Sequence, residues 1–202
     1  MTELIATFIF FFAVIDPIGT VPVYIAVTRN QDDAFKKRVA IKAVSVSAAV
    51  LLFFVLAGEI ILNAIKIPLP AFQIAGGIVL LLFALSMIFG EGKPESEIKS
   101  VKSATETAIF PLAMPSIASP GAMLGAVLMT RNNEFTWVEQ AITSSIMLSV
   151  LMVVLILLLL ARFVHRFIGD SGASIISRIM GLILTSVAVN NILAGISDYF
   201  TL

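Results

Sequence analysis

Residues 4–28 read LIATFIFFFAVIDPIGTVPVYIAVT, and Asp16 is the only charged residue among them. A helix needs roughly 20 mostly apolar residues to cross the hydrocarbon core of a bilayer, so this stretch is long enough to span a membrane. Its middle, however, places Asp16 directly before Pro17. A proline inside a helix removes one hydrogen bond and clashes with the preceding turn. The stretch therefore predicts a membrane span that is interrupted near mid-bilayer.

The rest of the chain has the same apolar character. Hydrophobic residues make up 59% of the 202 residues and charged residues only 13%, with a mean hydropathy of +1.05. A soluble domain carries about 25% charged residues, so lipid is the expected outer solvent. Five further windows are long enough to span: Ile41–Ile65, Ile67–Phe89, Ala108–Thr130, Ala141–Ala161 and Ile179–Ser197. The sequence predicts an all-α polytopic membrane protein with six transmembrane helices in a single membrane domain, residues 1–202.

Basic residues are divided unequally between the two sides of the predicted membrane domain. Cytoplasmic loops of membrane proteins carry an excess of Lys and Arg. With six spans, 11 of the 13 basic residues fall at the first, third and fifth loops and their flanks, and only Lys66 and Arg131 fall on the other side. Both termini are therefore expected outside. Residues 91–107 mix both signs of charge and are expected to form a cytoplasmic linker.

The two halves that this linker joins, about 1–90 and 108–202, resemble each other. Residues 16–19 read DPIG and residues 119–122 read SPGA, and the tripeptide TRN closes a span in each half. Three spans per half is an odd number, so the second copy must enter the membrane in the opposite direction. Inverted repeats with broken helices are a known architecture of secondary transporters, in which substrate binds near the bilayer midplane.

Each interruption places a good helix N-cap residue directly before a proline. Both residue types favour the start of a helix, so the first and fourth spans are expected to stop there and resume as a new half-helix. Irregular backbone at membrane depth is tolerated only where protein buries it or water lines it. The free N–H groups of a half-helix attract anions such as a carboxylate. We expect a substrate site near these breaks, formed by Asp16, Pro17, Gly19, Ser119, Pro120, Gly121, Asn190 and Asn191. The competing interpretation is a pair of structural proline kinks.

Asp16 lies near mid-bilayer, where a carboxylate is costly and usually functional. It can cap its own half-helix, bind the amine of a zwitterion whose carboxylate lies near Ser119, or hold a coupling ion, H⁺ or Na⁺. Asn190 and Asn191 lie in the sixth span and either bind the solute or form interhelical hydrogen bonds. The sequence leaves these roles open.

The residue inventory excludes several functions. With no cysteine and one histidine, the chain has no disulfide scaffold, no thiolate metal site and no cysteine nucleophile. A net charge of zero gives no reason to expect nucleic-acid binding. An intramembrane protease needs paired aspartates, a Ser–His dyad or a metal motif, and the sequence has none of these. We expect no enzyme, no metal and no cofactor other than a coupling ion. A channel or a non-transporting membrane subunit is the alternative to a transporter, and a homo-oligomer stays open.

At its two interruptions the sequence resembles the MarC family of bacterial and archaeal integral membrane proteins. The resemblance rests on residues 12–22, FAVIDPIGTVP, and on residues 111–122, PLAMPSIASPGA. Asp16 and Ser119 depart from the Asn and Gly that are more common there in the family. The resemblance implies a plasma (inner) membrane protein related to SnatA-type amino acid transporters and to the LysE-like exporter group. It implies export of small neutral amino acids such as alanine or glycine; drug efflux is less favoured.

Overall fold

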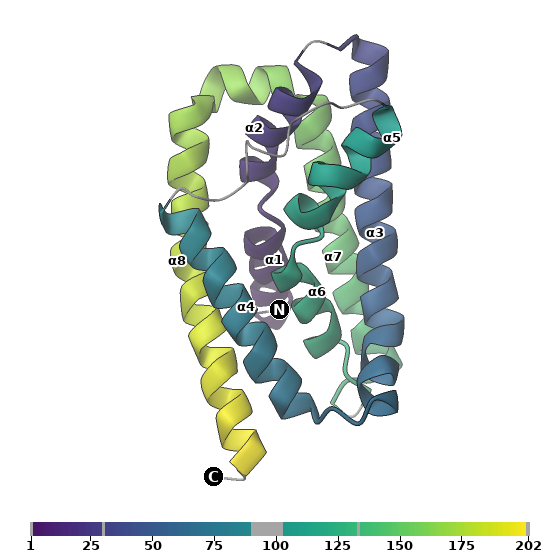
Figure 1. The fold of residues 1–202 in the computed structure, drawn as a ribbon, viewed down its shortest axis with the longest axis vertical. Coiled ribbons are helices and arrows are strands. Elements are labelled where there is room, and N and C mark those ends of the chain that lie inside the picture. The colour runs from purple at the N-terminus through teal and green to yellow at the C-terminus, as the bar shows by residue number, and fades with distance from the viewer. Residues whose placement is uncertain (1, 30, 90–102, 133, 201–202) are drawn as a thin grey trace.

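The computed structural model describes residues 2–29, 31–89, 103–132 and 134–200, and the secondary structure in these ranges is all helical (Figure 1). This confirms the all-α fold class. In chain order the elements are α1 (Thr2–Ile15), α2 (Pro17–Thr28), α3 (Asp33–Ala64), α4 (Leu69–Phe89), α5 (Ala104–Thr107), the irregular segment η2 (Ala108–Ile117), α6 (Pro120–Leu128), α7 (Trp137–Leu159) and α8 (Ala161–Phe200). Most of the predicted cytoplasmic linker, residues 91–102, lies outside the described residues; its last four residues form α5.

Five of the described helical stretches are long and apolar enough to cross a membrane, and a sixth is a bent pair. The pair joins Ala104–Ile117 to Pro120–Leu128 at an angle of 60°. The six predicted spans therefore all have a helical counterpart. The two broken spans differ, because Glu3–Thr28 qualifies as one spanning helix across its break.

Two helices begin earlier in the sequence than hydropathy predicted. The second span was expected from Ile41, but α3 starts at Asp33 because the Asp32 side chain accepts a hydrogen bond from Phe35 N at 2.8 Å and caps the helix. The segment before the sixth span, expected as a loop, is also helical. It forms the first part of α8 up to Gly169, where a φ of 63° turns the chain. This first part crosses the end of the bundle, and the rest of α8 descends along it (Figure 1).

Helices α4 and α8 make the most extensive helix contact and run antiparallel. Glycines line their seam and let the two backbones approach closely. A Cβ added at Gly181 would lie 2.9 Å from the Ala84 carbonyl oxygen, and one at Gly195 would lie 2.9 Å from the Pro70 carbonyl oxygen. Real Cβ atoms essentially never come that close, so both positions require glycine. Small residues at close helix crossings are typical of membrane proteins.

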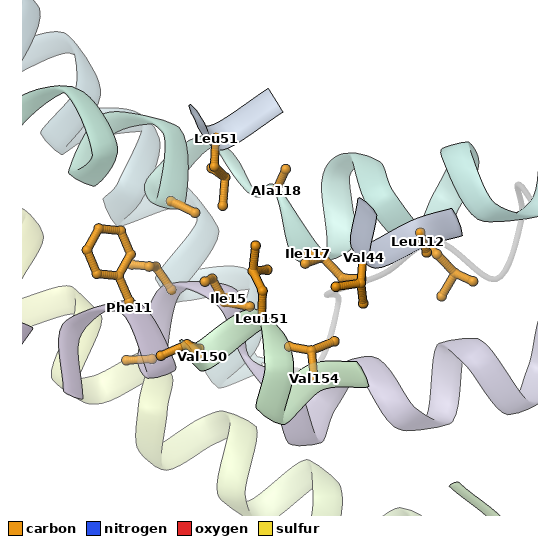
Figure 2. Packing of buried hydrophobic residues seen from close by; sticks show 14 of the residues in the cluster. Phe11, Ile15, Val44, Leu51, Leu112, Ile117, Ala118, Val150, Leu151 and Val154 are labelled. Atoms are coloured by element: carbon orange, nitrogen blue, oxygen red, sulfur yellow. The ribbon is translucent and has the colours of Figure 1, made fainter. Parts of the chain in front are cut away.

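The apolar core lies where the broken spans pack against α3 and α7. Figure 2 shows Phe11 and Ile15 of α1 beside Leu151 of α7, with Leu51 of α3 and Ile117 of the fourth span near them. All five side chains are at most 1% exposed. The outside of the bundle is apolar as well, with large exposed side chains on several helices, as a lipid-facing surface requires: Leu56, Leu82, Phe89 and Leu193.

The end of α8 lies at one end of the bundle, and the end of α2, the start of α3 and the start of α8 lie at the other (Figure 1). Each half contains a broken span, a long helix and a helix of the α4–α8 pair. The antiparallel course of α4 and α8 is consistent with the predicted inverted repeat, which makes these helices equivalent.

Candidate functional site

The first break consists of one residue. Asp16 adopts the left-handed conformation, with φ of 48° and ψ of 67°, between α1 and α2. Its Oδ1 accepts a hydrogen bond from Gly19 N at 3.0 Å, which makes Asp16 the N-cap of α2, and Pro17 occupies the first turn. Backbone bonds from Asp16 N to Phe12 O and from Thr20 N to Asp16 O, both 3.1 Å, flank the break as the last bond of α1 and the first bond of α2. The span keeps its direction all the same, because Glu3–Thr28 still forms one helix long enough to cross a membrane.

The other carboxylate oxygen of Asp16 faces α8. Ser177 Oγ donates to Asp16 Oδ2 at 3.0 Å, across 161 positions of sequence. Asp16 itself is 3% exposed. Gly19 makes this contact possible, because a Cβ at that position would collide with Asp16 Oδ2 and with Ser177 Oγ. Both oxygens of the buried carboxylate thus have a donor, one from the backbone of α2 and one from the sixth span.

The second break is longer and changes the direction of the chain. The φ and ψ angles of Phe110 and Met114 are extended inside η2, which holds Pro111 and Pro115, and α6 begins only at Pro120. Ser119 is the N-cap of α6, because its Oγ accepts from Ala122 N at 3.2 Å. The fourth span therefore breaks at the predicted residue, with several additional irregular residues before it.

The two breaks contact each other. Ser119 Oγ donates to the carbonyl oxygen of Val14 at 2.7 Å, and Ser119 and Val14 are both fully buried. Val14 lies at the end of α1, where helix carbonyls lose their intrahelical partners. The N-cap residue of one half-helix therefore completes the hydrogen bonding of the other break.

A second polar contact joins the same two spans. Thr20 Oγ1 donates to Asp16 O at 3.0 Å and lies 3.2 Å from Ser116 Oγ. A hydroxyl has one proton, so the Ser116 hydroxyl donates to Thr20 in this pair. Thr20 is fully buried and Ser116 is 4% exposed. The two breaks thus share a small buried polar cluster, which consists of several hydroxyl groups and the Asp16 carboxylate.

Most of the predicted site residues meet at this place. Pro17 and Gly121 are buried beside their caps, and Gly121 packs so closely on α4 that an added Cβ would lie 2.5 Å from Leu80 Cδ1. Pro120, however, is exposed. Asn190 and Asn191 are not brought to the breaks: the helix rise places them about 20 Å along α8 from Ser177, with Asn190 exposed and Asn191 half-buried. Whether they bind a solute stays a prediction.

The helix ends determine the electrostatics of the site. α2 and α6 both start at the contact between the breaks and run away from each other, so two positive N-terminal ends converge in the core (Figure 1). The Asp16 carboxylate offsets one of them, and a neutral hydroxyl caps the other. Within the described part of the chain, no group of three or more His, Asp or Glu side chains could hold a metal ion.

The chain matches known proteins over nearly its full length. The family model described as "MarC family integral membrane protein" matches residues 1–200. A UPF0056 membrane protein of Methanocaldococcus jannaschii is 37% identical over 188 residues, which cover 92% of this chain and 91% of the relative. The UPF0056 membrane protein YhcE of Escherichia coli is 31% identical over 199 residues, which cover 96% of this chain and 91% of that relative. No solved structure matches the chain. The resemblance found at the two breaks is confirmed: the chain belongs to the MarC family of integral membrane proteins.

Proposed function

We propose that this protein is a secondary transporter that exports small neutral amino acids, such as alanine or glycine, by alternating access at the two helix breaks. One observation carries the proposal: the N-cap residues of both half-helices lie in one buried polar cluster, joined by the Ser119–Val14 hydrogen bond. Unwound backbone at membrane depth is the usual place of substrate sites in transporters built from inverted repeats. A pair of purely structural kinks has no need to meet.

The charges of the cluster suit a zwitterion. An amine that displaces Ser177 from Asp16 Oδ2 gains a carboxylate partner, and a carboxylate at the start of α6 gains the free N–H groups and positive end of that helix. In this proposal Asp16 is also the residue that binds the coupling ion, H⁺ or Na⁺. The proposal assigns no catalytic residue and no metal.

The burial of the cluster supports alternating access rather than a permanent pore. Asp16, Thr20, Ser116 and Ser119 are all at most 4% exposed, so a solute reaches them only after helices separate. The contacts that hold the breaks together are hydroxyl hydrogen bonds, and interhelical bonds of this kind contribute about 0.6 kcal/mol on average in a membrane. When the cluster opens, water or solute replaces the lost partners, so that no acceptor is left buried and unpaired, and opening costs little free energy per contact.

The orientation belongs to the same proposal. We place the protein in the plasma (inner) membrane with both termini outside, because 11 of its 13 basic residues fall on the opposite side. The direction of transport follows the resemblance to the exporter group and rests on that alone.

Counterflow tests the transport proposal. Purified protein in liposomes loaded with unlabelled alanine is diluted into labelled alanine, with empty liposomes as the control. A carrier accumulates label transiently above its equilibrium level, whereas a channel only equilibrates it. Lactate and ethylamine, each of which lacks one charge of the zwitterion, should not compete. Equilibration without overshoot would support a channel, and the absence of any protein-dependent flux across a panel of neutral amino acids would support a non-transporting subunit; either result overturns the proposal.

A further inference from the structure

A cavity of about 520 Å³ lies where α2 ends and α8 begins, away from the helix breaks. Its walls come from the end of α2, the start of α3, the end of α7 and the start of α8. Five of its lining residues are basic, namely Arg29, Lys36, Lys37, Arg162 and His165. Asp33 is the one carboxylate among the described residues that line it. We refer to this feature as the basic cavity.

The arginines and lysines of the basic cavity have little neutralisation from carboxylates of the described residues. Lys36 Nζ lies 4.0 Å from Asp33 Oδ1, at the limit of an ion pair, and the Asp33 side chain is 90% exposed. Among the side chains that the structure describes, no carboxylate forms an ion pair with Arg29, Lys37 or Arg162. Like charges gathered from three separate helices repel one another, and an anion placed between them removes that cost. This arrangement of cations favours the binding of an anion.

The remaining walls of the basic cavity are apolar. Ile25, Leu158, Leu159 and Ala161 line it beside the charged groups. Tyr24 also lies in the wall, and its hydroxyl donates a hydrogen bond to the Lys36 carbonyl oxygen at 3.0 Å. A ligand that fits such a wall has one strongly anionic group and an apolar part, which describes a phospholipid better than a carboxylate metabolite. Arg and Lys together are the usual binders of phosphate oxygens.

The first part of α8 gives independent support for a membrane-surface location. Ala161–Ile168 lies across the end of the bundle, nearly perpendicular to the spans (Figure 1). Phe163 and Phe167 on this segment are 61% and 77% exposed, and their rings pack at 4.9 Å from each other. Arg162 and Arg166 each precede one of these rings. A helix with exposed aromatic and basic side chains is typical of segments that lie in the headgroup region of a bilayer.

We propose that the basic cavity binds a phosphate group, supplied by the headgroup of an anionic phospholipid or by a soluble phosphate ester. The site is separate from the helix breaks and does not depend on the transport proposal. Lys37 and Arg162 contact the phosphate from two different helices. Basic clusters on this side of membrane proteins bind anionic lipid headgroups through the same chemistry.

Binding of short-chain lipids to detergent-solubilised protein, followed as a shift in Tm with ligand concentration, tests this proposal. The probes are dioctanoyl phosphatidylglycerol, dioctanoyl phosphatidylcholine and glycerol 3-phosphate. The double variant Lys37→Gln/Arg162→Gln removes two cavity cations. Its matched control, Arg38→Gln/Arg166→Gln, removes the same charge from the same two helices at residues that do not line the cavity. The size-exclusion profile verifies that each variant is folded.

We expect phosphatidylglycerol to bind the wild type and the control variant equally, and the cavity variant about 100-fold more weakly, at about tenfold per charged contact. Tighter binding of phosphatidylglycerol than of glycerol 3-phosphate identifies lipid as the source, and equal binding identifies a soluble ester; both support a phosphate site. Equal loss in the two double variants shows a dependence on net charge alone. That result, or binding of none of the anionic probes to the wild type, overturns the proposal.

Discussion

Replacing Ser119 by alanine should destabilise the protein more than its size suggests, because one hydroxyl makes two hydrogen bonds at the contact between the breaks. Loss of the N-cap bond to Ala122 N costs about 1 kcal/mol. Loss of the 2.7 Å bond to Val14 leaves a fully buried carbonyl oxygen unpaired, which costs about 1 to 3 kcal/mol. We expect the free energy of unfolding to fall by about 2 to 4 kcal/mol.

Ser119→Gly separates these two contributions. Glycine at an N-cap costs only a few tenths of a kcal/mol, so this variant loses mainly the bond to Val14 and should be less destabilised than Ser119→Ala. Ser145→Ala is the matched control, because Ser145 is exposed on α7 and its hydroxyl donates only to its own helix, to Ala141 O at 2.7 Å. That variant should stay within about 0.5 kcal/mol of the wild type.

The measurement is reversible unfolding of purified protein in bicelles, by steric trapping, with all three variants compared under one condition. A Ser119→Ala protein as stable as Ser145→Ala would show that the contact between the breaks contributes nothing, and the reasoning behind the site would be refuted. If Ser119→Ala and Ser119→Gly lose the same free energy of unfolding, the contribution assigned to the N-cap bond is refuted, but the contribution of the bond to Val14 is not.

Three further results are expected. Asp16→Asn keeps a good N-cap but removes the charge, and should lower alanine counterflow by at least about tenfold; unchanged flux removes the carboxylate from the mechanism. Gly181→Ala forces a Cβ against a backbone carbonyl of α4 and should lower the free energy of unfolding by about 1 to 3 kcal/mol. Gly172→Ala meets only the Ile168 side chain and gains helix propensity, so it should be less destabilising than Gly181→Ala; equal effects in unfolding titrations would contradict the close backbone contact between α4 and α8. The chain has no cysteine, so single cysteines report topology directly: on intact cells an impermeant maleimide should label Thr2→Cys but reach Lys37→Cys only after permeabilisation, and the reverse pattern inverts the orientation.

The positions of both breaks could be predicted because the signal is local. An N-cap residue before proline in an apolar window has few alternatives in a bilayer, where every backbone group needs a partner. The contact between the breaks is consistent with the predicted repeat. Ser177 could not be found in this way, since a lone serine near the start of a span has no distinguishing pattern, and its partner Asp16 is 161 positions away.

Helix starts were predicted less well, for a related reason. A hydropathy window detects apolar stretches, but α3 starts with a charged turn before its apolar stretch, and this start is defined by the Asp32 cap. The first part of α8 mixes arginine and phenylalanine and was missed because it lies across the bundle rather than through it. Asn190 and Asn191 were marked by polarity within a span, a signal that carries no information on distance; the structure places them about 20 Å along α8 from Ser177, and a role in binding stays a prediction.

The glycine seam between α4 and α8 restricts how the molecule can move. A slide of one helix along the other by a full turn, about 5.4 Å, would bring side chains against backbone carbonyls that now face glycine. Translation along this pair is therefore opposed sterically. Because one helix comes from each half, a relative motion of the halves that keeps α4 and α8 packed has to be a tilt rather than a slide.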